Sequence, residues 1–178
     1  MRFVVALLPM VVLIACSSPS NPAKAEPTVN HQQIIDRYIH DIWPAISAYN
    51  ADHAQAGSAA KQFAAVTEPN LPADQFNALR KAAQGLGRQG EYDAQDQTSH
   101  YNDGLTLGHA DVQSAQAGDA TLVVCYTYEH YSYVDVSDTR HDAAASEVSV
   151  KLKNVVGTWY LNEINADHPV PNCHASNS

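Results

Sequence analysis

Basic side chains are scarce in this sequence, and no cluster of them occurs. The 178 residues include 10 Lys and Arg against 19 Asp and Glu, which gives a formal net charge of −9. This balance argues against nucleic acid as a partner, because phosphates require clustered Lys and Arg. Charged residues make up only 16% of the chain and apolar residues 45%. Such a composition favours a packed core over disorder, and the length fits a single domain.

The motifs that mark several kinds of enzyme and metal site are also missing. The sequence contains no Gly-rich phosphate loop, no Gly-x-Ser-x-Gly elbow and no Cys-x-x-Cys pair. Nine histidines are present, but none has the i, i+4 spacing of a helical zinc pair. We interpret them as solvated side chains and expect neither a metal nor a cofactor.

Long apolar runs are absent as well. The apolar run at residues 3–14 is broken only by Pro9 and is too short for a transmembrane helix, which needs about 20 apolar residues. It follows Arg2 and has the length of a signal-peptide core. The run leads into the tetrapeptide Leu13-Ile14-Ala15-Cys16.

This tetrapeptide resembles the bacterial lipobox, in which an aliphatic residue, a tolerant position and a small residue precede a cysteine. The resemblance implies that residues 1–15 are a lipoprotein signal peptide and that the Cys16 thiol carries diacylglycerol. Residues 16–29 then read as a flexible Ser- and Pro-rich tether, with residues 30–178 as one domain. We expect the protein on the extracytoplasmic face of the cell membrane. The alternative is an ordinary secretory signal that is cleaved elsewhere.

Three cysteines are present, so lipid on Cys16 leaves the pair Cys125 and Cys173. An exported protein lies outside the reducing cytosol, and we therefore predict a disulfide between them. Two free thiols, one of them buried, are the alternative.

Helices are predicted in the first half of the chain. Asn30 is a candidate N-cap for an amphipathic helix that runs to about residue 57, with Pro44 producing a kink or a short break. Its predicted buried stripe consists of Ile35, Ile39, Ile42, Ile46 and Tyr49, widened by Ile34, Tyr38 and Trp43. A second helix is predicted over 58–66, and a third from Pro72 to Gly85 or Gly87. Residues 88–104 are predicted as a loop.

The apolar period changes to two in the second half. Strands are predicted over 105–115, 119–135, 145–154 and 157–165, with short turns that imply an antiparallel meander. Residues 119–135 contain four tyrosines, at 126, 128, 131 and 133. A bulge at Glu129 and His130 would bring all four to one face; strict alternation would split them between two faces.

This order of elements, ending in the turn Gly157-Thr158-Trp159, resembles the nuclear transport factor 2-like superfamily. The resemblance implies a cystatin-like cone, in which N-terminal helices pack on a curved antiparallel sheet of four or more strands. Exported lipoproteins of the mycobacterial type carry such domains. One departure is that no early strand is evident between the helices, although residues 88–104 could contain one. An unrelated α+β roll is the rival architecture.

The function inferred from the sequence is binding without catalysis. The ligand would be a small apolar molecule or an envelope protein, and the conjectural cavity lining is Trp43, Tyr126, Tyr128 and Trp159. The alternative is a small isomerase or lyase that uses Glu129, His130 or Asp135 for proton transfer. A structural or blocking surface lipoprotein is the third hypothesis.

Overall fold

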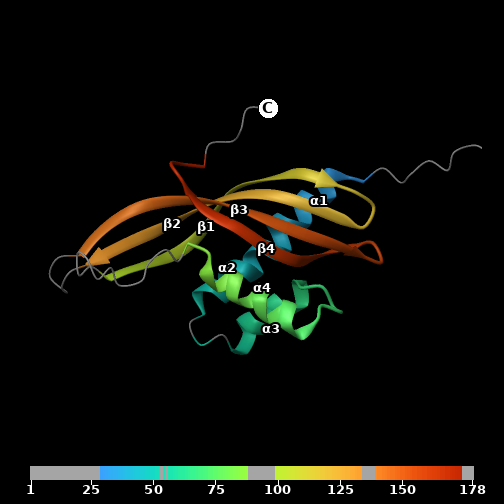
Figure 1. The fold of residues 1–178 in the computed structure, drawn as a ribbon, viewed down its shortest axis with the longest axis horizontal. Coiled ribbons are helices and arrows are strands. Elements are labelled where there is room, and N and C mark those ends of the chain that lie inside the picture. The colour runs from blue at the N-terminus through green and yellow to red at the C-terminus, as the bar shows by residue number, and fades with distance from the viewer. Residues whose placement is uncertain (1–28, 53, 55, 88–98, 134–138, 174–178) are drawn as a thin grey trace, which may run out of the picture.

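The computed structural model describes residues 29–52, 54, 56–87, 99–133 and 139–173. Helices lie on one side of a curved antiparallel sheet whose strand order is β1-β2-β3-β4 (Figure 1). The predicted α+β architecture of helices packed on a four-stranded meander is therefore confirmed. The helices are α1 (His31–Arg37), η1 (Tyr38–Ile42), α2 (Trp43–Ala51), α3 (Gly57–Val66) and α4 (Ala73–Gly85). The strands are β1 (Ser99–Ala115), β2 (Asp119–Tyr133), β3 (Thr139–Val155) and β4 (Thr158–Val170).

The segments α1, η1 and α2 run on as one N-terminal helix. Asn30 caps it as predicted, because its side-chain oxygen accepts hydrogen bonds from the first turn, including one from the Gln32 N–H at 3.0 Å. The segment η1 is a π-turn, in which the Trp43 N–H bonds back to the Tyr38 carbonyl. It ends at Ile42, two residues before Pro44, which has no N–H to give to the helix. The interruption predicted from Pro44 thus takes the form of a widened turn before the proline.

The π-turn changes which residues of this helix are buried. Ile35 and Ile39 were predicted on the buried stripe, but both are only half-buried. Ile34 and Tyr38, one position earlier in each case, are fully buried instead. A π-turn holds more residues than an α-turn, so it rotates the residues before it relative to those after it. The later part of the predicted stripe is buried as expected, at Ile42, Ile46 and Tyr49.

Two further helices complete the layer. The N-terminal helix ends at Ala51, earlier than predicted, and the Asp52 carboxylate accepts two hydrogen bonds from the backbone that follows, both at 3.0 Å. The helices α3 and α4 agree with the predicted second and third helices, and α4 ends at Gly85. The buried Asn50 amide donates to three carbonyls at this end of α4, at 3.0 to 3.1 Å. These carbonyls belong to Ala83, Gln84 and Leu86.

The strands follow the predicted meander, but β1, β3 and β4 extend beyond their predicted bounds, while β2 is described over residues 119–133 of the predicted 119–135. Residues 99–104, predicted as part of a loop, form the start of β1, where residues 99–103 pair with the end of β2. The remainder of that predicted loop, residues 88–98, lies outside the described residues. The β3–β4 turn falls where it was predicted, and Val156 and Gly157 have positive φ values of 51° and 84°. Two positive φ values in succession are what a tight two-residue hairpin turn requires.

The irregularities of the sheet lie in its outer strands, β1 and β4. Strand β2 pairs with β3 from one end to the other without a register shift, so the bulge predicted at residues 129–130 is wrong. Strict alternation then turns Tyr126 and Tyr128 toward the helices and Tyr131 and Tyr133 toward the outer face. A central strand is held by neighbours on both sides, and the extra residues are therefore accommodated at the edges.

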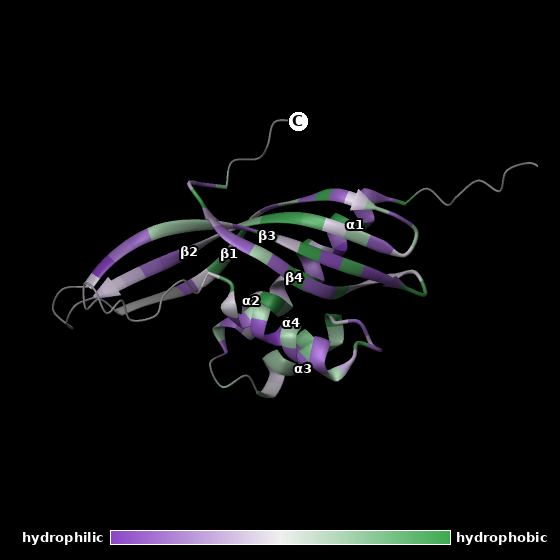
Figure 2. Cartoon of the chain, viewed as in Figure 1, coloured by the Kyte–Doolittle hydropathy of each residue, from purple (hydrophilic) through white to green (hydrophobic). Residues whose placement is uncertain are grey.

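The hydrophobic core lies between the helices and the inner face of the sheet. Its fully buried large side chains come from both layers, including Tyr49 and Phe63 from the helices and Tyr126 and Leu152 from the sheet. Val29, one residue before the cap, already packs against this core. Hydrophilic residues predominate at the C-terminal end of β2 and the N-terminal end of β3, and these two ends extend past the helices (Figure 2). The sheet thus continues beyond its own core.

Candidate functional site

The four aromatic residues predicted to line a cavity all lie in the core. The exposed fractions are 6% for Trp43, 0% for Tyr126, 5% for Tyr128 and 4% for Trp159. The ring centroids of Trp43 and Tyr126 are 5.6 Å apart, and those of Tyr126 and Tyr128 are 5.9 Å apart. These three rings pack against one another between the N-terminal helix and β2. They contribute to folding through their mutual contacts.

The hydroxyl group of Tyr126 connects separate segments of the chain. It accepts a hydrogen bond from the Gly87 N–H and donates one to the Asp167 carboxylate, both at 2.8 Å. Ser146 lies opposite Tyr126 in the register of β2 and β3, and its hydroxyl donates to that of Tyr128 at 3.4 Å. We call these five residues the Tyr126 network. It links the end of α4 to β2, β3 and β4.

Two residues with left-handed backbone conformations lie at this network: Gly87, which belongs to it, and Ala166, which precedes Asp167. Gly87 has φ 64°, and a Cβ atom there would lie 3.2 Å from the ring of Tyr128. Ala166 has φ 53° and occupies a register irregularity in β4. The extra residue allows Asp167, the next in the chain, to reach Tyr126. A left-handed conformation at a residue other than glycine costs on the order of 1–3 kcal/mol, and such residues concentrate at constrained sites.

Burial governs the protonation state of the network. Burial raises the pKa of Tyr126 far above its usual value, and the charge of Asp167 raises it further, so the phenol stays neutral and acts as a donor. Partial burial of the Asp167 carboxyl also raises its pKa, while hydrogen bonds from Tyr126 and Gly87 oppose that shift. A carboxylate with a raised pKa beside a tyrosine can transfer protons. Here, however, both partners of the Tyr126 hydroxyl are groups of the chain itself.

Sequence reasoning found the two tyrosines of this network and missed the partners of Tyr126. Asp167 lies beyond the predicted end of the last strand at residue 165, and its position depends on the irregularity at Ala166. Gly87 was identified only as a possible helix stop. A signal for Ser146 did exist, since it is a small polar residue within a predicted strand.

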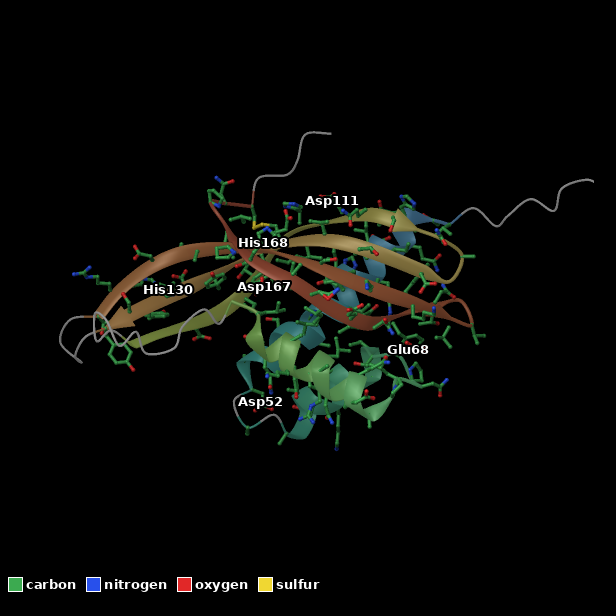
Figure 3. All side chains as sticks on the ribbon, viewed as in Figure 1. Asp52, Glu68, Asp111, His130, Asp167 and His168 are labelled. Carbon is green, nitrogen blue, oxygen red and sulfur yellow. A yellow bond between two sulfur atoms is a disulfide. The ribbon has the colours of Figure 1, made fainter. Side chains whose placement is uncertain are left out.

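Glu129 and His130, the two described residues among those proposed for proton transfer, do not form one site. Glu129 and His130 are neighbours on β2, so their side chains point to opposite faces of the sheet. The Glu129 side chain is 45% exposed, and its carboxylate contacts the imidazole of His141 on β3. His130 lies on the distal part of the sheet, away from Asp167 (Figure 3). Asp135 falls outside the described residues.

The distal part of the sheet, residues 99–103, 129–133 and 139–143, forms an arm that extends past the helices (Figure 1). On its outer face, the Tyr131 ring stacks on the His141 ring with the centroids 4.7 Å apart and the planes at 27°. The same imidazole contacts Glu129. Tyr131 is half-buried and His141 is exposed. The arm thus presents an aromatic ring, an imidazole and a carboxylate together on an open surface.

The predicted disulfide is confirmed by the positions of the two cysteines. The sulfur atoms of Cys125 and Cys173 are 2.06 Å apart, and the Cα atoms are 5.5 Å apart. Gly108 of β1 lies beneath the bond, and a Cβ there would lie 2.7 Å from the Cβ of Cys173. The bond therefore holds the segment after β4 against the outer face of β1 and β2. Cys16 lies outside the described residues.

Surface clefts accompany these features. One, of about 360 Å³, lies between α4 and β4 and includes Leu79 and Ile164 among its lining residues. Another, of about 420 Å³, lies between the N-terminal helix and the β3–β4 hairpin. Arg37 lines this cleft, but its guanidinium already forms an ion pair with Asp41 at 2.8 Å and donates a hydrogen bond to the Trp159 carbonyl at 3.2 Å. Within the described part of the chain, no group of three or more His, Cys, Asp or Glu side chains could hold a metal ion.

Comparison with known proteins leaves the family open. No protein-family model and no curated protein sequence matches this chain. Across the described residues, no helix combines the length and the apolar character needed to cross a bilayer. The function therefore has to be inferred from the chain's own residues and geometry.

Proposed function

We propose that this chain is an exported, lipid-anchored protein of the bacterial cell envelope whose domain binds an envelope protein without catalysis. The lipobox-like Leu13-Ile14-Ala15-Cys16 supports the anchor. The bond between Cys125 and Cys173 supports export, because disulfides persist outside the cytosol. The membrane partner of the anchor would be the lipid bilayer, with the domain on its extracytoplasmic face.

The observation that carries the binding part of the proposal is the distribution of aromatic residues. The candidate cavity lining is packed in the core, whereas Tyr131 and His141 meet on the open outer face of the arm. Aromatic side chains are enriched at protein interfaces, where they supply contact area and a polar group together. A protein partner at the arm therefore fits the structure better than an apolar ligand in the interior.

We further propose that the domain is a nuclear transport factor 2-like cone. Three features support this assignment: the helices-then-strands order, the curvature of the sheet around the N-terminal helix (Figure 1), and the closing Gly157-Thr158-Trp159 turn. Among residues 29–87 as described, only Thr67 makes a β-bridge, to Leu161. An early strand between the helices is thus reduced to a single bridge.

A catalytic role is less well supported. The hydrogen bond between Tyr126 and Asp167 is the observation that favours one. However, Tyr126 has an exposed fraction of 0%, and its hydroxyl already bonds both Gly87 and Asp167. A substrate would have to displace these contacts before it could reach the hydroxyl. We therefore assign the pair a structural role.

Site-specific photocrosslinking in intact cell envelopes tests the binding proposal. A photoreactive phenylalanine analogue is placed at Tyr131, or, as a matched control, at Tyr160, a half-buried tyrosine of β4. We expect a protein adduct of defined mass at position 131 and severalfold less at position 160. Equal yields at the two positions, or an adduct with a small molecule only, would overturn binding at the arm. No adduct at either position would favour a structural or blocking role.

A further inference from the structure

Part of strand β3 has a free edge. On one side, β3 pairs with β2 along its whole length, as far as the pair Thr139–Tyr133. On the other side, its pairing with β4 stops at Ala145–Val170. Residues 139–144 therefore have a neighbouring strand on one side only, among the residues that the structure describes (Figure 1). Their outer backbone groups are available to a further strand.

The end of β4 explains why this edge is left open. Pro171 follows directly after β4, and it has no N–H to continue a ladder of hydrogen bonds. Two residues later, Cys173 is bonded to Cys125 on the outer face of β2. The disulfide thus directs the chain across the sheet instead of along the edge of β3.

The charges on the free edge would be complementary to those of a second, antiparallel copy of the same strand. Residues 139–143 are all exposed. Arg140 and Asp142 are two positions apart, so they lie on the same face of the strand. Neither of them forms an ion pair with another described residue. In an antiparallel pair of identical strands centred on His141, Arg140 of each strand would lie opposite Asp142 of the other.

We propose that two copies of this chain associate through these edges, with residues 139–143 of one copy pairing antiparallel to the same residues of the other. The pairing joins two sheets across a two-fold axis at His141, as an isologous interface requires. Opposite charges directly across an antiparallel pair are stabilising, and this register contains two such pairs. The pairing stops at residue 143, before Ala145, where β3 pairs with the end of β4, so no strand has to be displaced on either copy.

The contact is short, which sets the strength to expect. Five residues from each copy bury much less than the ~1,000 Å² of a stable interface, so the dimer is a reversible one. A membrane that concentrates lipid-anchored copies would favour it. The inference does not depend on the partner proposed above, because it concerns the edge of β3 and not its outer face.

Sedimentation velocity of the purified full chain over a range of concentrations tests this pairing through charge exchange. We expect concentration-dependent dimers for the wild type, with the dimer about tenfold weaker in either Arg140→Asp or Asp142→Arg, where like charges face each other. The double variant R140D/D142R should restore dimerisation. Lys151→Asp, a charge reversal on the fully paired part of β3, is the control and should leave the dimer unchanged.

Three results would overturn the proposal. A chain that stays monomeric at every concentration would show that the edge charges keep copies apart. Dimers that respond equally to Lys151→Asp and to the edge variants would show a general charge effect. Dimers that none of the variants weakens would place the contact elsewhere on the molecule. Circular dichroism of each variant shows whether it has folded, and the restoring double variant guards against a folding artefact.

Discussion

A single hydroxyl group, that of Tyr126, connects parts of the chain that are far apart in sequence. Gly87 lies 39 residues before Tyr126 and Asp167 lies 41 residues after it. A buried donor or acceptor without a partner costs more than a hydrogen bond gains, so each member of such a group depends on the others. The Tyr126 network therefore couples the end of α4 to the C-terminal half of β4.

Replacing this hydroxyl should destabilise the fold without changing the core volume. Tyr126→Phe leaves the Gly87 N–H and the Asp167 carboxyl without their shared partner, and we expect a loss of about 1–3 kcal/mol in the free energy of unfolding. Urea denaturation measures it. Tyr160→Phe is the matched control and should change stability by less than about 0.5 kcal/mol. Equal losses in the two variants would contradict the role given to the network.

The raised pKa of Asp167 predicts a pH dependence of stability. The folded state binds the Asp167 proton more tightly than the ordinary pKa of 3.8 implies. This contribution to the free energy of unfolding is therefore present at low pH, and it is lost as the pH rises through the raised pKa. Asp167→Asn has no such titration. The free energy of unfolding of this variant minus that of the wild type should rise with pH across this window and then level off.

Urea denaturation of both proteins from about pH 3 to pH 8 measures this difference. The subtraction removes the contributions of the other carboxylates, which both proteins share. A difference that stays constant, or that falls as the pH rises, would show that the carboxyl of Asp167 is not desolvated in the folded protein.

At the scale of elements, features set by adjacent residues could be predicted and features set by distant ones could not. The cap at Asn30, the stop at Gly85 and the turn at Val156 and Gly157 each depend on a few neighbouring residues, and all three are where the sequence indicated. The irregularity at Ala166 depends on the register between β3 and β4, which no local pattern encodes. For that reason the sequence did not indicate Asp167 as a partner of Tyr126.

The contact between the disulfide and Gly108 of β1 is another feature set by residues that are distant in the sequence. Gly108→Ala places a Cβ 2.7 Å from the Cys173 Cβ and 3.1 Å from the Cys125 carbonyl oxygen, so the strand or the bond has to shift. We expect a loss of at least about 1–3 kcal/mol, typical of overpacking. Gly118→Ala is the control, since a Cβ at that position would have no atom outside its immediate neighbours within 4 Å. Thermal unfolding that ranks the two variants equally would contradict this packing.

At the scale of the whole molecule, the sheet is larger than the core it covers. The aromatic residues over the helices are buried, while the arm extends past them with its outer face open and, among the described residues, no neighbouring strand on the β3 edge at 139–144. The helices-then-meander order was predictable because the apolar period changes once along the chain. The arm was not, because the strands corresponding to β1 and β3 were predicted too short, and residues 99–104 were assigned to a loop in which a strand was only left open. The open arm is the surface to which the proposed protein partner is assigned.

The central claim is that this domain is held at a membrane by lipid on Cys16, and mass spectrometry of the protein extracted from the membrane fraction tests it most directly. The account predicts an N-terminal peptide that begins at Cys16 and carries a diacylglyceryl group on its thiol. Cys16→Ser should move the protein from the membrane fraction to the soluble one. An unmodified N-terminus at any residue other than Cys16 would contradict the account.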